Sequence, residues 1–352
     1  MLAEPTAVPP RPRSSAPQVV ALRALKLGDL LVAVPALRAM RHHWPSHHLV
    51  LATSGWLRDL VDLVGGVDRL LPQDGLRHGI DASARGAEVV VNLHGAGPRS
   101  NELLDELHPA RRIGHRGHGW NGPPWVDDLH ERHRWIRLLE HHGVPGDPDD
   151  LYLDPPEVPS RNPGAVVVHH GAAYGSRRWP PARFARVARW LSERGEHVVV
   201  TGSGAERGRA LAIAAMAGLP AGAVAAGRTD LPELAALVAG ARLVVTGDTG
   251  IAHLGYAYRT PSVVLFGPVP PRYWGPPEHG PHVALGGDAA RRGDPFAPDP
   301  DPALLAVDVA DVIAAARELL GAENRGTCST SRYAANTCPG GGGGTETATA
   351  GS

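Results

Sequence analysis

A carboxylate that could act as a base follows the first apolar stretch of the chain. Asp29 comes after the apolar stretch 19–25 and Gly28, at the start of a predicted helix over 30–41. We expect Gly28 to permit a tight turn there. An aspartate at such a position is usually a helix N-cap, but it could also take a proton from a substrate hydroxyl. Pro35 is expected to kink the helix, and such local strain favours the second interpretation.

The strongest candidate site is the segment 241–254, in which a predicted strand leads through a Gly-Asp-Thr-Gly turn into a helix. Backbone amides at the start of a helix point outward and bind anions, helped by the helix dipole. The amides of Thr249, Gly250 and Ile251 are therefore a candidate anion site. Asp248, in the turn itself, could accept hydrogen bonds from sugar hydroxyls.

His253 lies one helical turn after Thr249 and Gly250, on the same face of the predicted helix. It could contact the same ligand. A lone histidine on a helix more often has a structural role, so both interpretations stay open.

Two further strand ends carry charged residues. After the strand 165–169, Arg177 and its neighbours stand before a helix; they could bind phosphate, or they could be solvated connector arginines. After the strand 197–201, Glu206 could bind a ribose diol, or it could simply favour the helix dipole. The surrounding Gly-Ser-Gly-Ala-Glu-Arg stretch only partly matches a dinucleotide fingerprint, because Arg207 replaces its third glycine.

Composition excludes several classes of protein. The 35 Lys and Arg nearly balance the 36 Asp and Glu, which argues against a nucleic-acid partner. No apolar run approaches the ~18 residues of a membrane span. Cys328 and Cys338 lie near the C-terminus, so they cannot cross-link a core. The histidines are scattered without ligand spacing, and we expect no metal. These features predict a soluble, intracellular protein.

Apolar runs alternate with helical patterns on both sides of a proline-rich segment. Strands are predicted at 19–25, 48–52, 88–93, 165–169, 197–201, 242–246 and 262–266, and helices at 30–41, 56–64, 100–107, 181–194, 205–217, 231–238, 250–258 and 302–320. This alternation predicts two doubly wound α/β domains with parallel sheets, whose ligands bind at the carboxyl ends of the strands.

The expected domain boundaries follow changes in composition. We predict a disordered leader over 1–17, an N-terminal domain over 18–155, a C-terminal domain over 156–321 and a disordered Gly/Ser/Thr tail over 322–352. The proline-rich residues from about 144 to 164 are expected to form a stiff linker between the domains.

Three blocks of the chain together resemble glycosyltransferase family 9, the ADP-heptose:lipopolysaccharide heptosyltransferase-like enzymes. They are 22–41, with Gly28 and Asp29; 170–180, with Arg177; and 231–268, with the Gly-Asp-Thr-Gly turn. The resemblance implies a GT-B fold, in which two Rossmann-like domains face each other across a cleft. The N-terminal domain would hold the acceptor and the C-terminal domain the nucleotide-sugar.

The resemblance also implies an activity: inverting, metal-independent transfer of a heptose-like sugar from a nucleotide-diphosphate donor, without a cofactor. The acceptor would be a glycan, a lipid-linked saccharide or a small molecule. The implied roles are Asp29 as general base, Arg177 and the amides of Thr249, Gly250 and Ile251 as diphosphate ligands, Asp248 as sugar ligand, Glu206 as ribose ligand and His253 close by. Ala172 and Ala173 replace the hydroxyl residues of the family, and Arg177 replaces a lysine, which bears on the identity of the donor.

Other functions stay open on this scaffold: a nucleotide-sugar epimerase, a non-catalytic nucleotide-sugar-binding module, and, less favoured, an NAD oxidoreductase. The expected location is the cytoplasm, with peripheral contact to the inner face of the membrane if the acceptor is a lipid.

Overall fold

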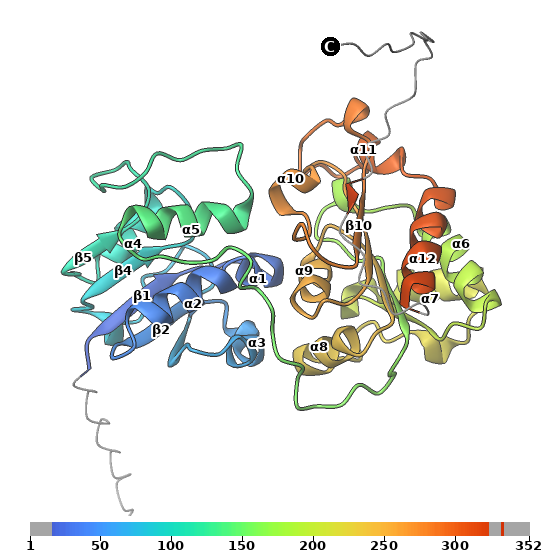
Figure 1. Ribbon diagram of the computed structural model, residues 1–352, viewed down its shortest axis with the longest axis horizontal. Coiled ribbons are helices and arrows are strands. Elements are labelled where there is room, and N and C mark those ends of the chain that lie inside the picture. The colour runs from blue at the N-terminus through green and yellow to red at the C-terminus, as the bar shows by residue number, and fades with distance from the viewer. Residues whose placement is uncertain (1–15, 324–331, 334–352) are drawn as a thin grey trace, which may run out of the picture.

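The computed structural model describes residues 16–323 and 332–333, which form two α/β domains joined by a long connector (Figure 1). The predicted leader lies outside the described residues up to position 15. Of the predicted tail, α12 continues to Glu323 and Arg332–Tyr333 form a short strand, so these parts are in regular structure. The other residues of the tail lie outside the described part of the chain.

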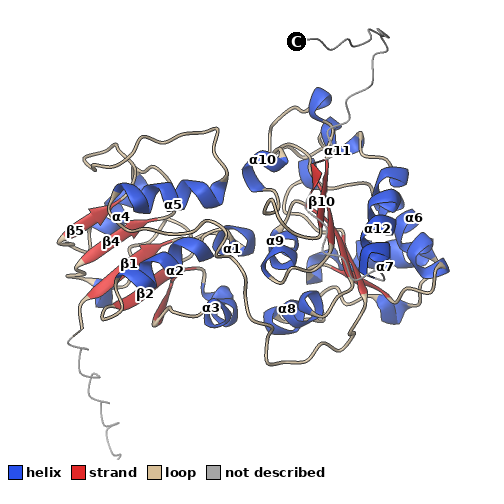
Figure 2. Ribbon diagram, in the orientation of Figure 1, coloured by secondary structure: helices blue, strands red, loops and turns tan. Residues whose placement is uncertain are grey.

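The N-terminal domain is built on a parallel sheet with helices on both of its faces (Figure 2). Its strands are β1 (Gln18–Leu22), β2 (His48–Thr53), β3 (Arg69–Pro72), β4 (Val89–Asn92) and β5 (Arg111–Ile113), in the order β3-β2-β1-β4-β5. Its helices are α1 (Leu27–Leu31), α2 (Val34–His43), α3 (Arg58–Val64), α4 (Arg99–Asp105) and α5 (Glu131–His141). After Gln18, the central strand β1 is apolar and buried, as expected for a strand with both faces of the sheet covered.

The C-terminal domain repeats this architecture. Its strands are β6 (Val166–His169), β7 (Val198–Thr201), β8 (Leu243–Gly247), β9 (Ser262–Leu265), β10 (His282–Leu285) and β11 (Arg332–Tyr333), in the order β11-β10-β9-β8-β6-β7 and all parallel. Its helices are α6 (Pro181–Glu193), α7 (Arg207–Ala217), α8 (Leu231–Ala239), α9 (Gly250–Ala257), α10 (Pro271–Trp274), α11 (Pro302–Leu305) and α12 (Val309–Glu323). The prediction of two doubly wound parallel domains is therefore confirmed.

The helix predicted over 30–41 is wrong in one important respect. The chain forms two short helices, α1 and α2, with a break at Val32 and Ala33. Pro35 is then the second residue of α2, where its missing amide has no intrahelical partner to lose. The proline neither kinks a helix nor stores strain, so it gives no support to a catalytic role for Asp29.

Gly28 also differs from its predicted role. It is the second residue of α1, and its backbone does not adopt the positive φ that would require glycine. What it provides is space, because a Cβ at this position would lie 2.9 Å from Cδ2 of His253 in the other domain.

The two domains meet where α1 approaches α9. Besides the contact between Gly28 and His253, a Cβ on Gly250 would lie 2.7 Å from the Leu27 side chain. Two glycines, one on each helix, thus allow the helices to touch. The connector contacts both domains as well: Asp150 pairs with Arg38 of α2, and the Leu153 amide donates to the Ala257 carbonyl of α9.

Substitution of Gly28 by alanine should destabilise the protein by about 1–3 kcal/mol, because the added methyl overpacks the contact between the domains. The His253 ring has little freedom to move, since it packs edge-on against Tyr256 and Trp274. Gly208 is a matched control, because it is also the second residue of its helix but has open space around it. Thermal unfolding should show a lower Tm for Gly28→Ala and an unchanged or higher Tm for Gly208→Ala. Equal shifts for the two variants would contradict the close approach.

Candidate functional site

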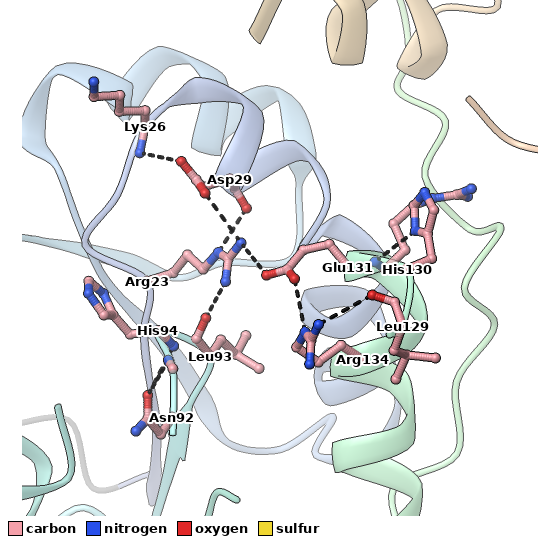
Figure 3. Close-up of polar contacts among 12 residues, drawn as sticks. Arg23, Lys26, Asp29, Asn92, Leu93, His94, Leu129, His130, Glu131 and Arg134 are labelled. Carbon is pink, nitrogen blue, oxygen red and sulfur yellow. Dashed lines mark hydrogen bonds and ion pairs between the residues drawn. The ribbon is translucent and has the colours of Figure 1, made fainter. Parts of the chain in front are cut away.

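A buried arginine organises the candidate site in the N-terminal domain (Figure 3). Arg23 follows β1, and its side chain is 1% exposed. Its Nε donates to the Asp29 carbonyl at 2.8 Å, and its Nη1 donates to the Leu93 carbonyl at 2.5 Å. Its Nη2 lies 3.3 Å from a Glu131 carboxylate oxygen and 3.7 Å from Oδ1 of Asp29. The guanidinium also lies over the Trp135 ring, 4.7 Å from its centroid.

These contacts stabilise the buried positive charge of Arg23. An unpaired buried arginine would be costly, and here carbonyls, carboxylates and an aromatic face all contact it. Glu131 in turn accepts from Nε of Arg134 at 2.9 Å. The loop that carries Asp29 is therefore fixed to β4 and α5 through one side chain. Arg23 and Glu131 were not predicted from the sequence, because their pairing spans 108 residues and no local pattern indicates it.

The Asp29 carboxylate itself is partly accessible, with 26% of the side chain exposed. Its Oδ2 accepts a hydrogen bond from the Lys26 amide at 3.1 Å. Lys26 is the N-cap of α1, so Asp29 is its third residue and bonds back to the cap. The N-cap interpretation of Asp29 is therefore wrong, because the N-cap is Lys26, three residues earlier. Asp29 still stabilises the start of the helix through its hydrogen bond from the Lys26 amide. Its remaining lone pairs leave it able to accept from a ligand.

The C-terminal domain brings Arg177 and Asp248 together. Arg177 lies in a short 3-10 turn after β6, and its Nη1 is 3.3 Å from Oδ2 of Asp248. Asp248 is only 4% exposed. Burial raises the pKa of Asp248, Arg177 opposes that shift, and the charge of Asp29 adds to it. Asp29 and Asp248 come from opposite domains, on segments next to the contact between α1 and α9.

The amides of Thr249, Gly250 and Ile251 lie at the N-terminus of α9, beside this pair. Thr249 is the N-cap, with extended backbone angles, and its side chain forms no cap hydrogen bond. Within the described residues these three amides have no hydrogen-bond partner. Arg177 also has a buried Nε without a partner among those residues. Unused donors thus gather at one helix terminus, where the dipole favours an anion.

His253 lies on the same helix but points into the domain contact. It is 5% exposed and packs against Gly28, Tyr256 and Trp274. Burial lowers its pKa to about 3, and neighbouring His130, Arg132 and Arg177 act in the same direction. A neutral ring in this place serves the contact between the domains, in agreement with its structural interpretation.

Glu206 already has partners inside the protein. Its carboxylate accepts from the Ser203 amide at 2.8 Å, the Ser203 hydroxyl at 2.9 Å and the Ala172 amide at 3.1 Å. Burial acts to raise its pKa, but the hydrogen bonds from Ser203 and the nearby histidines His169 and His170 outweigh it, and the pKa is lowered. Glu206 therefore ties the loop that leads to Arg177 onto the start of α7. Its role toward a ribose stays a prediction.

Over 16–323 and 332–333, no three or more His, Cys, Asp or Glu side chains are grouped so that they could hold a metal ion. None of the helices that the structure describes has the length and apolar character needed to cross a bilayer.

Comparison with known proteins finds a family match that lies mostly in the C-terminal domain. Residues 153–287 match the family model of glycosyltransferase family 9 (heptosyltransferase). This segment is similar to family 9 proteins. The match covers the loop with Arg177 and the turn with Asp248, and it confirms the resemblance inferred from the sequence motifs.

Curated relatives match the chain in sequence, and a solved structure matches its fold. Lipopolysaccharide heptosyltransferase 1 of Pseudomonas aeruginosa is 38% identical over 135 residues, which cover 38% of this chain and 37% of that protein. Lipooligosaccharide heptosyltransferase 2 of Haemophilus ducreyi is 24% identical over 294 residues, which cover 71% and 83%. The structure of Escherichia coli ADP-heptose lps heptosyltransferase II superposes with a TM-score of 0.71 at 20% identity, covering 87% of this chain and 99% of that one. The predicted GT-B fold is confirmed.

The buried histidine at the domain contact predicts a loss of stability in acid. The folded protein holds the His253 pKa near 3, against 6.5 for an ordinary histidine. Below pH 6.5 the unfolded chain binds a proton that the folded ring does not. The neutral ring therefore contributes its full stability above pH 6.5, and this stability is lost as the pH falls toward 3. At pH 5 the loss in the free energy of unfolding amounts to about 2 kcal/mol.

Unfolding of the wild type and of His253→Gln at pH 7 and pH 5 tests this expectation. The glutamine does not titrate, so the variant should lose less stability between the two pH values. His279 is exposed, and His279→Gln should keep the pH dependence of the wild type. If His253→Gln also kept it, the ring would not be the group responsible.

Proposed function

We propose that this chain is a metal-independent, inverting glycosyltransferase that moves a heptose-like sugar from a nucleotide-diphosphate donor to an acceptor hydroxyl. One juxtaposition supports the proposal above all. A partly exposed carboxylate of the N-terminal domain, Asp29, lies on α1, which contacts α9 next to Asp248, and Asp248 is paired with Arg177 in the C-terminal domain. A base and an anion-binding group thus come from opposite domains, as transfer between two substrates requires.

In this mechanism Asp29 accepts the proton of the acceptor hydroxyl. The acceptor oxygen forms a bond to the anomeric carbon while the bond from that carbon to the diphosphate oxygen breaks. Attack from the face opposite the leaving group inverts the configuration. The electron pair leaves with the diphosphate, whose negative charge Arg177 and the amides of Thr249, Gly250 and Ile251 would stabilise. These donors are in place before the reaction, so little reorganisation is needed.

Asp248 would contact the sugar rather than the phosphates. Its carboxylate is buried and beside Arg177, so it is suited to accept hydrogen bonds from sugar hydroxyls at a fixed position. Glu206 would lie farther along, at the end of β7, where a ribose could replace part of its internal hydrogen bonding. His253 would act indirectly, by holding α9 against α1.

The names of the relatives suggest the substrates. Several are lipopolysaccharide or lipooligosaccharide heptosyltransferases, and one solved neighbour is named for ADP-heptose. We therefore propose an ADP-heptose-like donor and a lipopolysaccharide core or related glycan as acceptor. Such an acceptor would bring the protein to the cytoplasmic face of the membrane as a peripheral enzyme.

Replacing Asp29 by asparagine should lower the rate of transfer by about 10²–10⁴, the usual contribution of a general base. The amide can still accept from Lys26, so the helix start and ADP binding should persist. Asp311→Asn is a matched control: Asp311 accepts from the Asp308 amide at 3.1 Å in the same way, at the start of α12. Transfer is measured as ADP release from ADP-heptose with and without a heptose-deficient core acceptor. Undiminished transfer in Asp29→Asn would remove Asp29 as the base, and acceptor-independent release by the wild type would indicate an epimerase.

Removing the guanidinium in Arg177→Ala should weaken ADP binding by about tenfold to a hundredfold, the cost of one hydrogen bond to a charged group. Calorimetry in EDTA measures this without a metal. Arg186, an exposed arginine on α6, supplies the control Arg186→Ala, which should bind as the wild type does. An unchanged dissociation constant would exclude Arg177 as a phosphate ligand, and failure of the wild type to bind ADP, GDP or UDP would overturn the proposed donor class.

A further inference from the structure

One residue at the site is in conflict with its local structure. Lys26 is the N-cap of α1, and it is the sole lysine among the 35 Lys and Arg of the chain. An N-cap is normally a residue whose side chain accepts a bond from the helix amides, which an ammonium cannot do. Its positive charge also faces the positive end of the helix dipole. Where a residue breaks local rules in this way, a function is a common reason.

The Lys26 side chain points away from the Asp29 carboxylate, although the Lys26 amide bonds to it (Figure 3). Lys26 is exposed, and none of the carboxylates in the described part of the chain forms an ion pair with its ammonium. Instead Nζ lies over the Tyr174 ring, 5.4 Å from the centroid. Tyr174 belongs to the C-terminal domain, so this cation reaches across from one domain to the other.

The surroundings of Lys26 on the C-terminal domain are those of the proposed diphosphate site. Arg177 follows Tyr174 by three residues, and its Nε has no hydrogen-bond partner among the described residues. Leu27, the next residue after Lys26, packs against Gly250 at the start of α9. The ammonium of the N-terminal domain and the guanidinium and unused amides of the C-terminal domain thus lie on segments that contact each other. Arg177 is paired with Asp248, whereas the Lys26 charge is balanced by no carboxylate of the described residues, so an anion between the domains would be attracted by both cations.

We propose that Lys26 binds the diphosphate of the donor from the N-terminal domain, opposite Arg177 and the α9 amides. This inference rests on the proposed transferase function and extends it. The donor phosphates would then be held by cations of both domains, so that donor binding and domain contact stabilise each other. Tyr174 positions the ammonium while the site is empty.

Calorimetry with ADP tests the proposal on the full chain. Lys26→Gln removes the charge from an exposed side chain and should weaken ADP binding by roughly tenfold, as expected for one charge-assisted contact. Lys26→Arg should retain most of the affinity. Binding of the wild type should also fall more steeply with salt than binding of Lys26→Gln, because a charge contact is screened. Adenosine, which has no phosphate, should bind both proteins equally.

Arg85→Gln is the control, because Arg85 is an exposed cation of the same domain. It lies before β4, at the amino ends of the strands, whereas Lys26 follows β1 at their carboxyl ends. It should bind ADP as the wild type does. Equal ADP affinity of the wild type and Lys26→Gln would overturn the proposal, and so would an equal loss of adenosine affinity. A raised KM for the acceptor with unchanged ADP affinity would assign Lys26 to an anionic group of the acceptor instead. In each case a loss of ADP binding in Arg177→Ala would leave the proposed function standing, whereas a wild type that binds no ADP would overturn both.

Discussion

The close approach of α1 and α9 is the constraint on which the site depends. It is possible because each helix has a glycine at the point of contact, Gly28 facing His253 and Gly250 facing Leu27. A side chain on either glycine would separate the helices. That separation would move Asp29 and Lys26, which belong to the start of α1, away from the amides at the start of α9. The same pair of helices therefore sets both the distance between the domains and the relative positions of the groups in the candidate site.

Each half of the site is fixed within its own domain before the halves meet. In the N-terminal domain the buried Arg23 fixes the Asp29 loop to β4 and α5. In the C-terminal domain, Glu206 and the pairing of Arg177 with Asp248 hold the loop after β6. Groups held in this way lose little conformational entropy when a substrate binds.

Electrostatics distinguishes the two sides of the contact. The ammonium, the guanidinium and the helix amides suit a leaving group that gains negative charge, whereas Asp29 suits a hydroxyl that loses a proton. His253, at the contact between α1 and α9, is neutral because burial keeps its pKa near 3. A charged ring there would repel Arg177 and weaken the contact.

Local features could be predicted from the sequence alone: the parallel strands, the helices that follow them, the Gly-Asp-Thr-Gly turn and the family resemblance. These depend on residues close together in the chain, whose periodicity and turn chemistry are visible in any short window. The elements β3, β5, α5 and β10, which are short or rich in charge, were not predicted, and the predicted roles of Gly28 and Pro35 were wrong. Only the tertiary structure decided that Arg23 pairs with Glu131, that Gly28 meets His253 and that Lys26 reaches Tyr174. Such pairs are set by how the helices and domains pack, and no local pattern encodes the distance between residues so far apart in the chain.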